Sequence, residues 1–134
     1  DRVDAALADL RRIIDDNPRD AHALNAYGYT LAERRRDYAA ALPFVRRAHA
    51  IEPDSAPILD SLGWIELRLG REESALAFLR KAWSLLKDAE IAAHLGEALW
   101  LGGQQDEARA VWQEGRGIDP DNRALRQALE NYTP

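Results

Sequence analysis

Apolar residues recur with helical spacing along most of the chain. In residues 3–17 they stand three and four positions apart, which places them on one face of a helix. They are Val3, Ala6, Leu7, Leu10, Ile13 and Ile14. Asn17-Pro18 ends this helix, because the residue before a proline is driven out of the α region. The same spacing of apolar residues continues to the end of the chain, which is therefore predicted to be all-α, with eight helices and no strands.

A repeat with a period of about 34 residues underlies this pattern. Gly28, Gly63 and Gly96 lie 35 and 33 residues apart, and each follows a similar phrase. About thirteen residues after each glycine comes a small residue, and four residues later a bulky one. The pairs are Ala41/Val45, Ala75/Leu79 and Ala108/Trp112. This spacing predicts stacked helical hairpins.

Each hairpin has a physical logic. The glycine lets the second helix approach closely, since it has no Cβ atom. The small residue of the second helix faces that contact, and we expect the bulky residue to fill the space between hairpins. No hairpin buries its apolar face alone, so neighbouring hairpins must stack.

The repeats divide a single domain of 134 residues. Residues 1–18 are predicted to be the second helix of a truncated repeat, followed by repeat one (21–55), repeat two (56–88), repeat three (89–122) and a capping helix (123–134). Asp20, Asp37, Ser55 and Asp88 are predicted helix N-caps. Gly70 and Gly102-Gly103 are predicted helix ends or turns.

Repeat one holds one extra residue near Arg34-Arg35-Arg36, so we expect a longer turn there. These arginines are interpreted as a solvated C-terminal turn that complements the helix dipole. The alternative is a contact with an acidic partner.

The chain has no methionine and begins within a predicted helix, so we expect the natural protein to begin upstream. The helix of residues 3–17 would then lack its hairpin partner. We expect an exposed apolar strip with Leu7, Leu10 and Ile14, and either self-association through that end or fraying of the helix.

Composition narrows the classes of function. The net charge of −5 disfavours a nucleic-acid partner or an anionic membrane surface. The absence of cysteine excludes disulfides and thiolate metal sites. No apolar run approaches the length of about 18 residues that a membrane helix needs.

The spacing of these residues resembles the tetratricopeptide repeat over nearly the whole chain. Glu66, Gly115 and Lys87 depart from the family pattern, where an aromatic residue, an alanine and a closing proline are expected. The resemblance implies a right-handed superhelical solenoid of helical hairpins that binds a protein or peptide and is not an enzyme.

A narrower resemblance is carried by three phrases, which begin at Asn25, Leu59 and Ala92 and run through the repeat glycines. They are similar to the C-terminal repeats of proteobacterial lipoproteins anchored in the outer membrane. That resemblance implies a periplasmic adaptor for a carboxyl-terminal processing protease and its substrates. Alternatives are a cytoplasmic scaffold or chaperone, or a regulatory domain of a larger enzyme.

In the family, the first helices of the repeats line a concave groove. The resemblance therefore implies a protein-binding site in which Tyr29, Trp64 and Trp100 project toward a partner. The alternative is that Trp64 and Trp100 pack against the next repeat. The predicted groove residues are His22, Asn25, Tyr29, Glu33, Asp60, Ser61, Trp64, Arg68, Glu90, His94, Glu97 and Trp100.

The groove lacks the basic residues of the family's carboxylate clamp and is acidic on balance, so its ligand should be apolar with a neutral or basic flank. His94 and Glu97 stand three residues apart and could hold a metal weakly, but a hydrogen bond in the groove is favoured. No serine has the context of a nucleophile elbow, and Gly102-Gly103 follows a helix, unlike a phosphate-binding loop. We predict no catalytic, cofactor-binding or metal-binding residue.

Overall fold

The structure is a computed structural model, which describes residues 1–132. This part of the chain forms eight helices and no strands, so the all-α prediction is confirmed. The helices are α1 (Arg2–Asp16), α2 (Ala21–Arg35), α3 (Tyr38–Ile51), α4 (Ala56–Arg68), α5 (Glu72–Leu85), α6 (Ala89–Leu101), α7 (Gln105–Ile118) and α8 (Arg123–Tyr132). Residues 133–134 of the predicted capping helix lie outside the described part.

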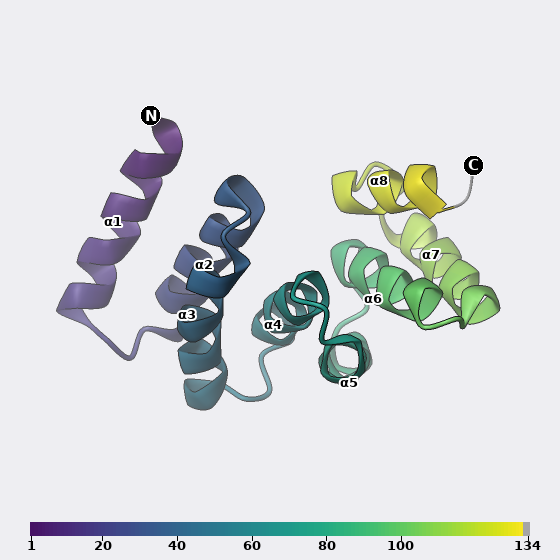
Figure 1. Ribbon diagram of the computed structural model, residues 1–134, viewed down its shortest axis with the longest axis horizontal. Coiled ribbons are helices and arrows are strands. Elements are labelled where there is room, and N and C mark those ends of the chain that lie inside the picture. Colours follow the sequence, from purple (N-terminus) through teal and green to yellow (C-terminus); the bar gives the residue numbers. More distant parts are fainter. Residues whose placement is uncertain (133–134) are drawn as a thin grey trace.

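Three helical hairpins stack side by side in an arc (Figure 1). The pairs α2/α3, α4/α5 and α6/α7 are the hairpins, and each first helix also contacts the first helix of the next hairpin. Helix α8 packs on α6 and α7, and it stands across the arc from α2 (Figure 1). The predicted solenoid of helical hairpins is confirmed. No helix in residues 1–132 is long and apolar enough to cross a membrane.

The repeat glycines lie at the closest approach of the two helices in each hairpin. A Cβ atom added at Gly63 would lie 2.6 Å from Cγ of Leu79, and one at Gly28 would lie 2.5 Å from Cγ2 of Val45. The bulky residue thus fills the space above the glycine of its own hairpin. This contact within the hairpin adds to the predicted packing between hairpins, since Val45 and Leu79 also share core clusters with residues of the next hairpin.

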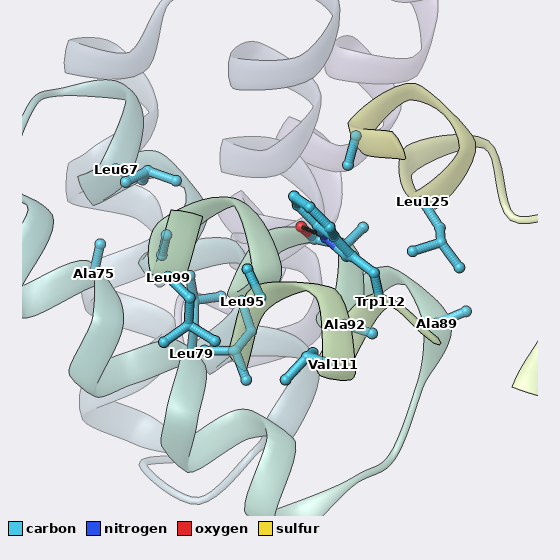
Figure 2. Packing of buried hydrophobic residues seen from close by; sticks show 14 residues of the cluster. Leu67, Ala75, Leu79, Ala89, Ala92, Leu95, Leu99, Val111, Trp112 and Leu125 are labelled. Atoms are coloured by element: carbon cyan, nitrogen blue, oxygen red, sulfur yellow. Dashed lines mark hydrogen bonds between the residues drawn. The ribbon is translucent and has the colours of Figure 1, made fainter. Parts of the chain in front are cut away.

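Trp112 is the largest of the three side chains that lie over a repeat glycine. It has no exposed surface, it lies over Gly96, and its Nε1 donates a hydrogen bond to the carbonyl oxygen of Ala93 at 3.2 Å. Figure 2 shows the indole between side chains from neighbouring helices, with Ala92 and Leu125 nearby. The end of the solenoid that carries α8 is therefore built around one tryptophan.

The helix ends follow the predicted caps. The side chains of Asp20, Asp37, Ser55 and Asp88 each accept a hydrogen bond from a backbone N–H in the first turn that follows. Gly70 and Gly103 have φ values of +82° and +86°, a left-handed conformation that suits glycine.

The extra residue of repeat one is in the helix and not in the turn. Helix α2 continues to Arg35, and Arg36 ends it in a left-handed conformation with φ of 54°. Only residues 36–37 separate α2 from α3, whereas residues 69–71 separate α4 from α5. The predicted longer turn was therefore wrong, because the added residue continues the helical hydrogen bonding of α2.

Helix α1 uses its apolar strip against α2. Ile14 is only 5% exposed, Leu7 and Leu10 are half-buried, and Ile13 is the residue left 44% exposed. The prediction that the strip is exposed was therefore wrong for Ile14, which is buried, whereas Leu7 and Leu10 keep part of their surface exposed. Self-association through this end stays a prediction.

The arginines at the end of α2 are not simply solvated. Arg35 pairs with the carboxylates of Asp1 and Asp4 on α1. All three arginines are exposed, as the interpretation of a solvated turn predicts, and Arg35 in addition joins α2 to α1.

Candidate protein-binding groove

A cavity of about 490 Å³ lies on the side of the arc formed by the first helices. Helices α2, α4, α6 and α8 supply most of its lining, and Tyr38 comes from α3. The lining residues are Tyr29, Glu33, Arg36, Tyr38, Trp64, Arg68, Glu90, Ala93, His94, Glu97, Arg123, Ala124, Gln127, Ala128, Asn131 and Tyr132. We call it the first cavity.

A second cavity of about 370 Å³ adjoins it and shares Tyr29 and Glu90. It lies toward the N-terminal ends of α4 and α6. Its lining residues are Asn25, Ala26, Tyr29, Pro57, Asp60, Ser61, Leu86, Asp88, Glu90 and Ile91. The two cavities together form what we call the groove.

The structure brings ten of the twelve predicted site residues into the lining of this groove. The two exceptions are His22 and Trp100. His22 is exposed, and its Nε2 lies 3.6 Å from Oε2 of Glu52. Trp100 stacks on Trp112, with ring centroids 5.7 Å apart. Its ring centroid also lies 6.1 Å from that of Tyr132 on α8, so Trp100 packs against the helix that follows its own hairpin, as in the alternative interpretation.

Trp64 is the centre of an aromatic wall. Its ring lies 5.7 Å from Tyr29, 6.0 Å edge-on from Tyr38 and 5.5 Å from the ring of His94, on which it stacks. Trp64 thus packs against the next repeat through His94 and lines the first cavity as well. The packing interpretation of Trp64 is confirmed, and its role in partner binding stays a prediction.

The groove-lining residues of α8 and Tyr38 were not predicted. If the counting used for repeats one to three is continued into α8, the groove positions fall at Ala124, Gln127, Ala128 and Asn131, all of which line the first cavity. The repeat register was therefore a signal that could have found them. Tyr38 lies on a second helix, so the same counting could not include it.

Buried polar pairs join successive first helices beneath the groove. Nδ1 of His94 lies 2.8 Å from Oδ1 of Asp60, and both side chains are 8% exposed. Burial is the largest single effect and disfavours the protonated imidazole, but the carboxylates of Asp60, Glu90 and Glu97 together outweigh it and raise the pKa of His94. The predicted hydrogen bond of His94 is therefore made to Asp60 within the protein.

A second network ties α4, α6 and α8 together. Nη2 of Arg68 lies 2.6 Å from Oε2 of Glu97, and the hydroxyl of Tyr132 donates to the same oxygen at 2.6 Å. Burial and the contact with Glu97 raise the pKa of Tyr132 to about 12. Arg68 and Glu97 thus neutralise each other on the groove floor.

The charges that remain are divided between the two cavities. Glu90 pairs with no lysine or arginine in residues 1–132, and burial together with the nearby carboxylates of Asp60 and Asp88 raises its pKa against the opposing effect of His94. Arg36 and Arg123 line only the first cavity. The second cavity is therefore acidic, and the first has mixed charge.

The groove does not offer a set of metal ligands. Within the described residues, no group of three or more histidine, aspartate or glutamate side chains is arranged to hold a metal ion. The groove instead combines aromatic rings, carboxylates and guanidinium groups, which are the kinds of group that recognise polypeptide side chains.

The architecture defines the class of protein, which is a solenoid of stacked helical hairpins with a concave groove. Solved structures share this fold. The crystal structure of TTC0263, a thermophilic TPR protein of Thermus thermophilus, superposes with a TM-score of 0.76 at 26% identity, and the match covers 97% of this chain and 72% of that one. The crystal structure of MamA gives 0.74 at 19% identity, over 96% of this chain and 78% of that one.

Relatives in sequence point the same way, although no family model matches the chain. The chain is 48% identical to TPR repeat-containing protein PA4667 of Pseudomonas aeruginosa over 89 residues, which are 66% of this chain and 15% of that protein. It is 28% identical over 116 residues to small glutamine-rich tetratricopeptide repeat-containing protein 2 of Mycosarcoma maydis, over 86% of this chain and 33% of that protein. The names of these relatives and the shared fold support the tetratricopeptide-repeat family for this chain.

Proposed function

We propose that the chain is a protein-interaction module that binds a partner polypeptide in its groove and has no catalytic activity of its own. One observation carries the proposal. Four alternate helices, α2, α4, α6 and α8, present side chains to adjoining cavities that hold an aromatic wall and unneutralised charges. Concave sites with a few convergent polar groups and aromatic anchors suit recognition of a ligand.

The finer form of the proposal is an adaptor of the bacterial envelope. In this form the full-length protein is anchored in the outer membrane, and the groove presents partner proteins to a periplasmic protease. The phrases around Gly28, Gly63 and Gly96 support it through their resemblance to lipoprotein repeats, and a bacterial relative 48% identical over 89 residues is compatible with it. The chain spans 15% of that relative's length, so the activity of the whole protein belongs to the proposal.

Site-specific photo-crosslinking in living cells tests the binding surface. A photoreactive amino acid at Gln127, which lines the groove, should capture a partner in the full-length protein. The same amino acid at Glu114, an exposed residue of α7 that lines neither cavity, should not. Capture from Glu114 alone would place the binding surface elsewhere.

Cell fractionation tests the location. The full-length protein should sediment with the outer membrane and be released by detergent. Recovery in the cytosolic fraction would overturn the envelope proposal and favour a cytoplasmic scaffold. The groove proposal does not depend on this outcome.

A further inference from the structure

We infer that the second cavity receives an arginine side chain of the bound partner. This inference rests on the proposed function, and it specifies the chemistry of one part of the groove. The partner's apolar residues would then lie in the first cavity against Trp64 and Tyr38, which line it.

The charges around the second cavity select a cation. Its lining holds three carboxylates, from Asp60, Asp88 and Glu90, and no lysine or arginine. Asp60 is offset by His94, and Asp88 accepts the backbone N–H groups of Glu90 and Ile91 at 3.1 and 3.2 Å. Glu90 is half-buried and pairs with no lysine or arginine within residues 1–132; the hydroxyl of Tyr29 donates a hydrogen bond to it, and His94 is the nearby cation. A partly desolvated carboxylate gains most from an added cation, because water no longer screens it fully.

The hydrogen-bonding groups favour a donor with several N–H groups. Oδ1 of Asn25, on the wall of this cavity, is buried and accepts no hydrogen bond within residues 1–132. An unpaired buried acceptor is costly, so a ligand that donates to it gains free energy. Tyr29 adds an aromatic ring to the same cavity.

Arginine fits this combination better than lysine. Its guanidinium is planar, can stack on an aromatic face and presents five N–H donors in a fixed fork. It can therefore donate to Glu90 while lying against Tyr29, and it reaches Oδ1 of Asn25 once that side chain turns into the cavity. A lysine ammonium supplies the charge without the planar stack.

The first cavity is less favourable for the same side chain, although Glu33 lines it. Arg36 and Arg123 line it, and Glu97 is already paired with Arg68 at 2.6 Å. A ligand arginine there would meet like charges, which disfavours that register. The two cavities of the groove therefore differ in charge. The position of the ligand's arginine determines which end of the ligand lies at the N-terminal ends of α4 and α6.

A randomised peptide library displayed on phage and selected against the intact protein is the test. Peptides selected by the wild type should share an arginine, and that preference should disappear in selection against Glu90→Gln. A synthetic copy of a selected peptide should lose affinity about tenfold or more when its arginine is replaced by citrulline, the loss expected for one charge-assisted hydrogen bond. Citrulline keeps the shape of the side chain and removes the charge.

Glu114→Gln is the matched control, because it makes the same change on the exposed surface of α7. Its affinity for the selected peptide should equal that of the wild type. Circular dichroism of Glu90→Gln should show unchanged folding.

The other outcomes separate this inference from the proposed function. Peptides without a basic residue that still lose binding with Trp64→Ala would overturn the arginine site and leave the groove proposal intact. Acidic peptides that need Arg36 and Arg123 would overturn it in favour of an anionic ligand. Peptides insensitive to every groove variant, or no selected peptide at all, would count against both.

Discussion

The three repeat glycines differ in what they would meet if they carried a side chain. At Gly63 an added Cβ would lie 2.6 Å from Cγ of Leu79, the middle of a side chain with two rotatable bonds. At Gly96 it would overlap the indole of Trp112, which is rigid and wholly buried. We therefore predict that Gly96→Ala destabilises the protein more than Gly63→Ala. Overpacking of this kind lowers the free energy of unfolding by about 1–3 kcal/mol or more. Urea unfolding followed by circular dichroism measures both.

Gly117 supplies the control for this comparison. It lies within α7, and nothing lies within 4 Å of an added Cβ. Gly117→Ala should raise the free energy of unfolding by up to about 1 kcal/mol, because alanine is the better helix former. If Gly96→Ala were as stable as Gly117→Ala, the hairpin contact would not be as close as described.

The buried pair of Asp60 and His94 predicts how stability depends on pH. The pKa of His94 is raised in the folded state, so the pair contributes fully below the ordinary histidine pKa of about 6.5 and loses its contribution as the pH rises through the folded value. The raised pKa of Glu90 acts in the same direction at lower pH, since protonation relieves a buried charge. The free energy of unfolding should therefore fall as the pH rises above the ordinary histidine pKa of about 6.5.

A double variant isolates the pair. Asp60→Asn combined with His94→Gln removes both charges and leaves no unpaired buried ion. Its urea midpoint should be nearly constant over the same pH range. A double variant that kept the slope of the wild type would assign the dependence to other groups.

The sequence named both members of this pair as ligand contacts, and the structure pairs them with each other. They stand 34 positions apart, one repeat length, so adjacent first helices bring them together. Glu66 shows the same limit, since it replaces an expected aromatic residue, yet it is buried and lies within 3.4 Å of Arg46 and Arg71. Repeat register predicts which face a side chain occupies, but the choice among partners on that face depends on rotamers that the sequence does not specify.

At the scale of the element, the end of α2 is the unusual one. Helices α4 and α6 are each followed by a glycine in the left-handed conformation, whereas α2 ends in Arg36 with φ of 54°. A side chain at such a position is strained, and glycine relieves the strain. Arg36→Gly should raise the free energy of unfolding by about 0.5–1 kcal/mol, and Gly70→Ala should lower it by about 1 kcal/mol.

Thermal unfolding of the two variants beside the wild type is the measurement. Because Arg36 also lines the first cavity, Arg36→Ala is a useful companion, since it removes the same side chain without relieving the backbone. If Arg36→Gly and Arg36→Ala changed stability equally, the effect would come from the side chain and not from the conformation.

The ends of the helices could be predicted from local chemistry in the sequence. The function of each helix within the fold could not. Four side-chain caps and two glycine ends were predictable because each depends on one or two neighbouring residues. The role of α8 was predicted only as a cover for the stack. In the structure it presents Gln127 and Asn131 to the first cavity, as a further first helix would. That role depends on the packing of a whole helix on α6, which only the continued register of the repeats could have indicated.

At the scale of the whole molecule, the arc divides its tryptophans between packing and the groove. Trp112 is wholly buried and Trp100 stacks on it. Trp83 lies against the core under Lys87, whose Nζ is 4.1 Å from its ring, and it lines neither cavity. Of the four tryptophans, Trp64 alone lines one of the two cavities of the groove. Trp83, Trp100 and Trp112 can therefore serve as controls when Trp64 is substituted in a binding experiment.

This division gives the final prediction. Trp64→Ala should weaken binding of the captured partner by about 2 kcal/mol, roughly thirtyfold, because it removes an aromatic anchor of the groove. Trp112→Ala should lower the free energy of unfolding by about 3–5 kcal/mol, the cost of emptying a buried tryptophan site. Trp100→Ala should resemble Trp112→Ala in kind, with loss of stability and little change in affinity of the folded fraction. Trp83→Ala should leave affinity unchanged. Melting and affinity measured on the same four samples decide the matter: if Trp64→Ala lost stability as Trp112→Ala does and kept full affinity, Trp64 would be a packing residue and the groove would not be the binding surface.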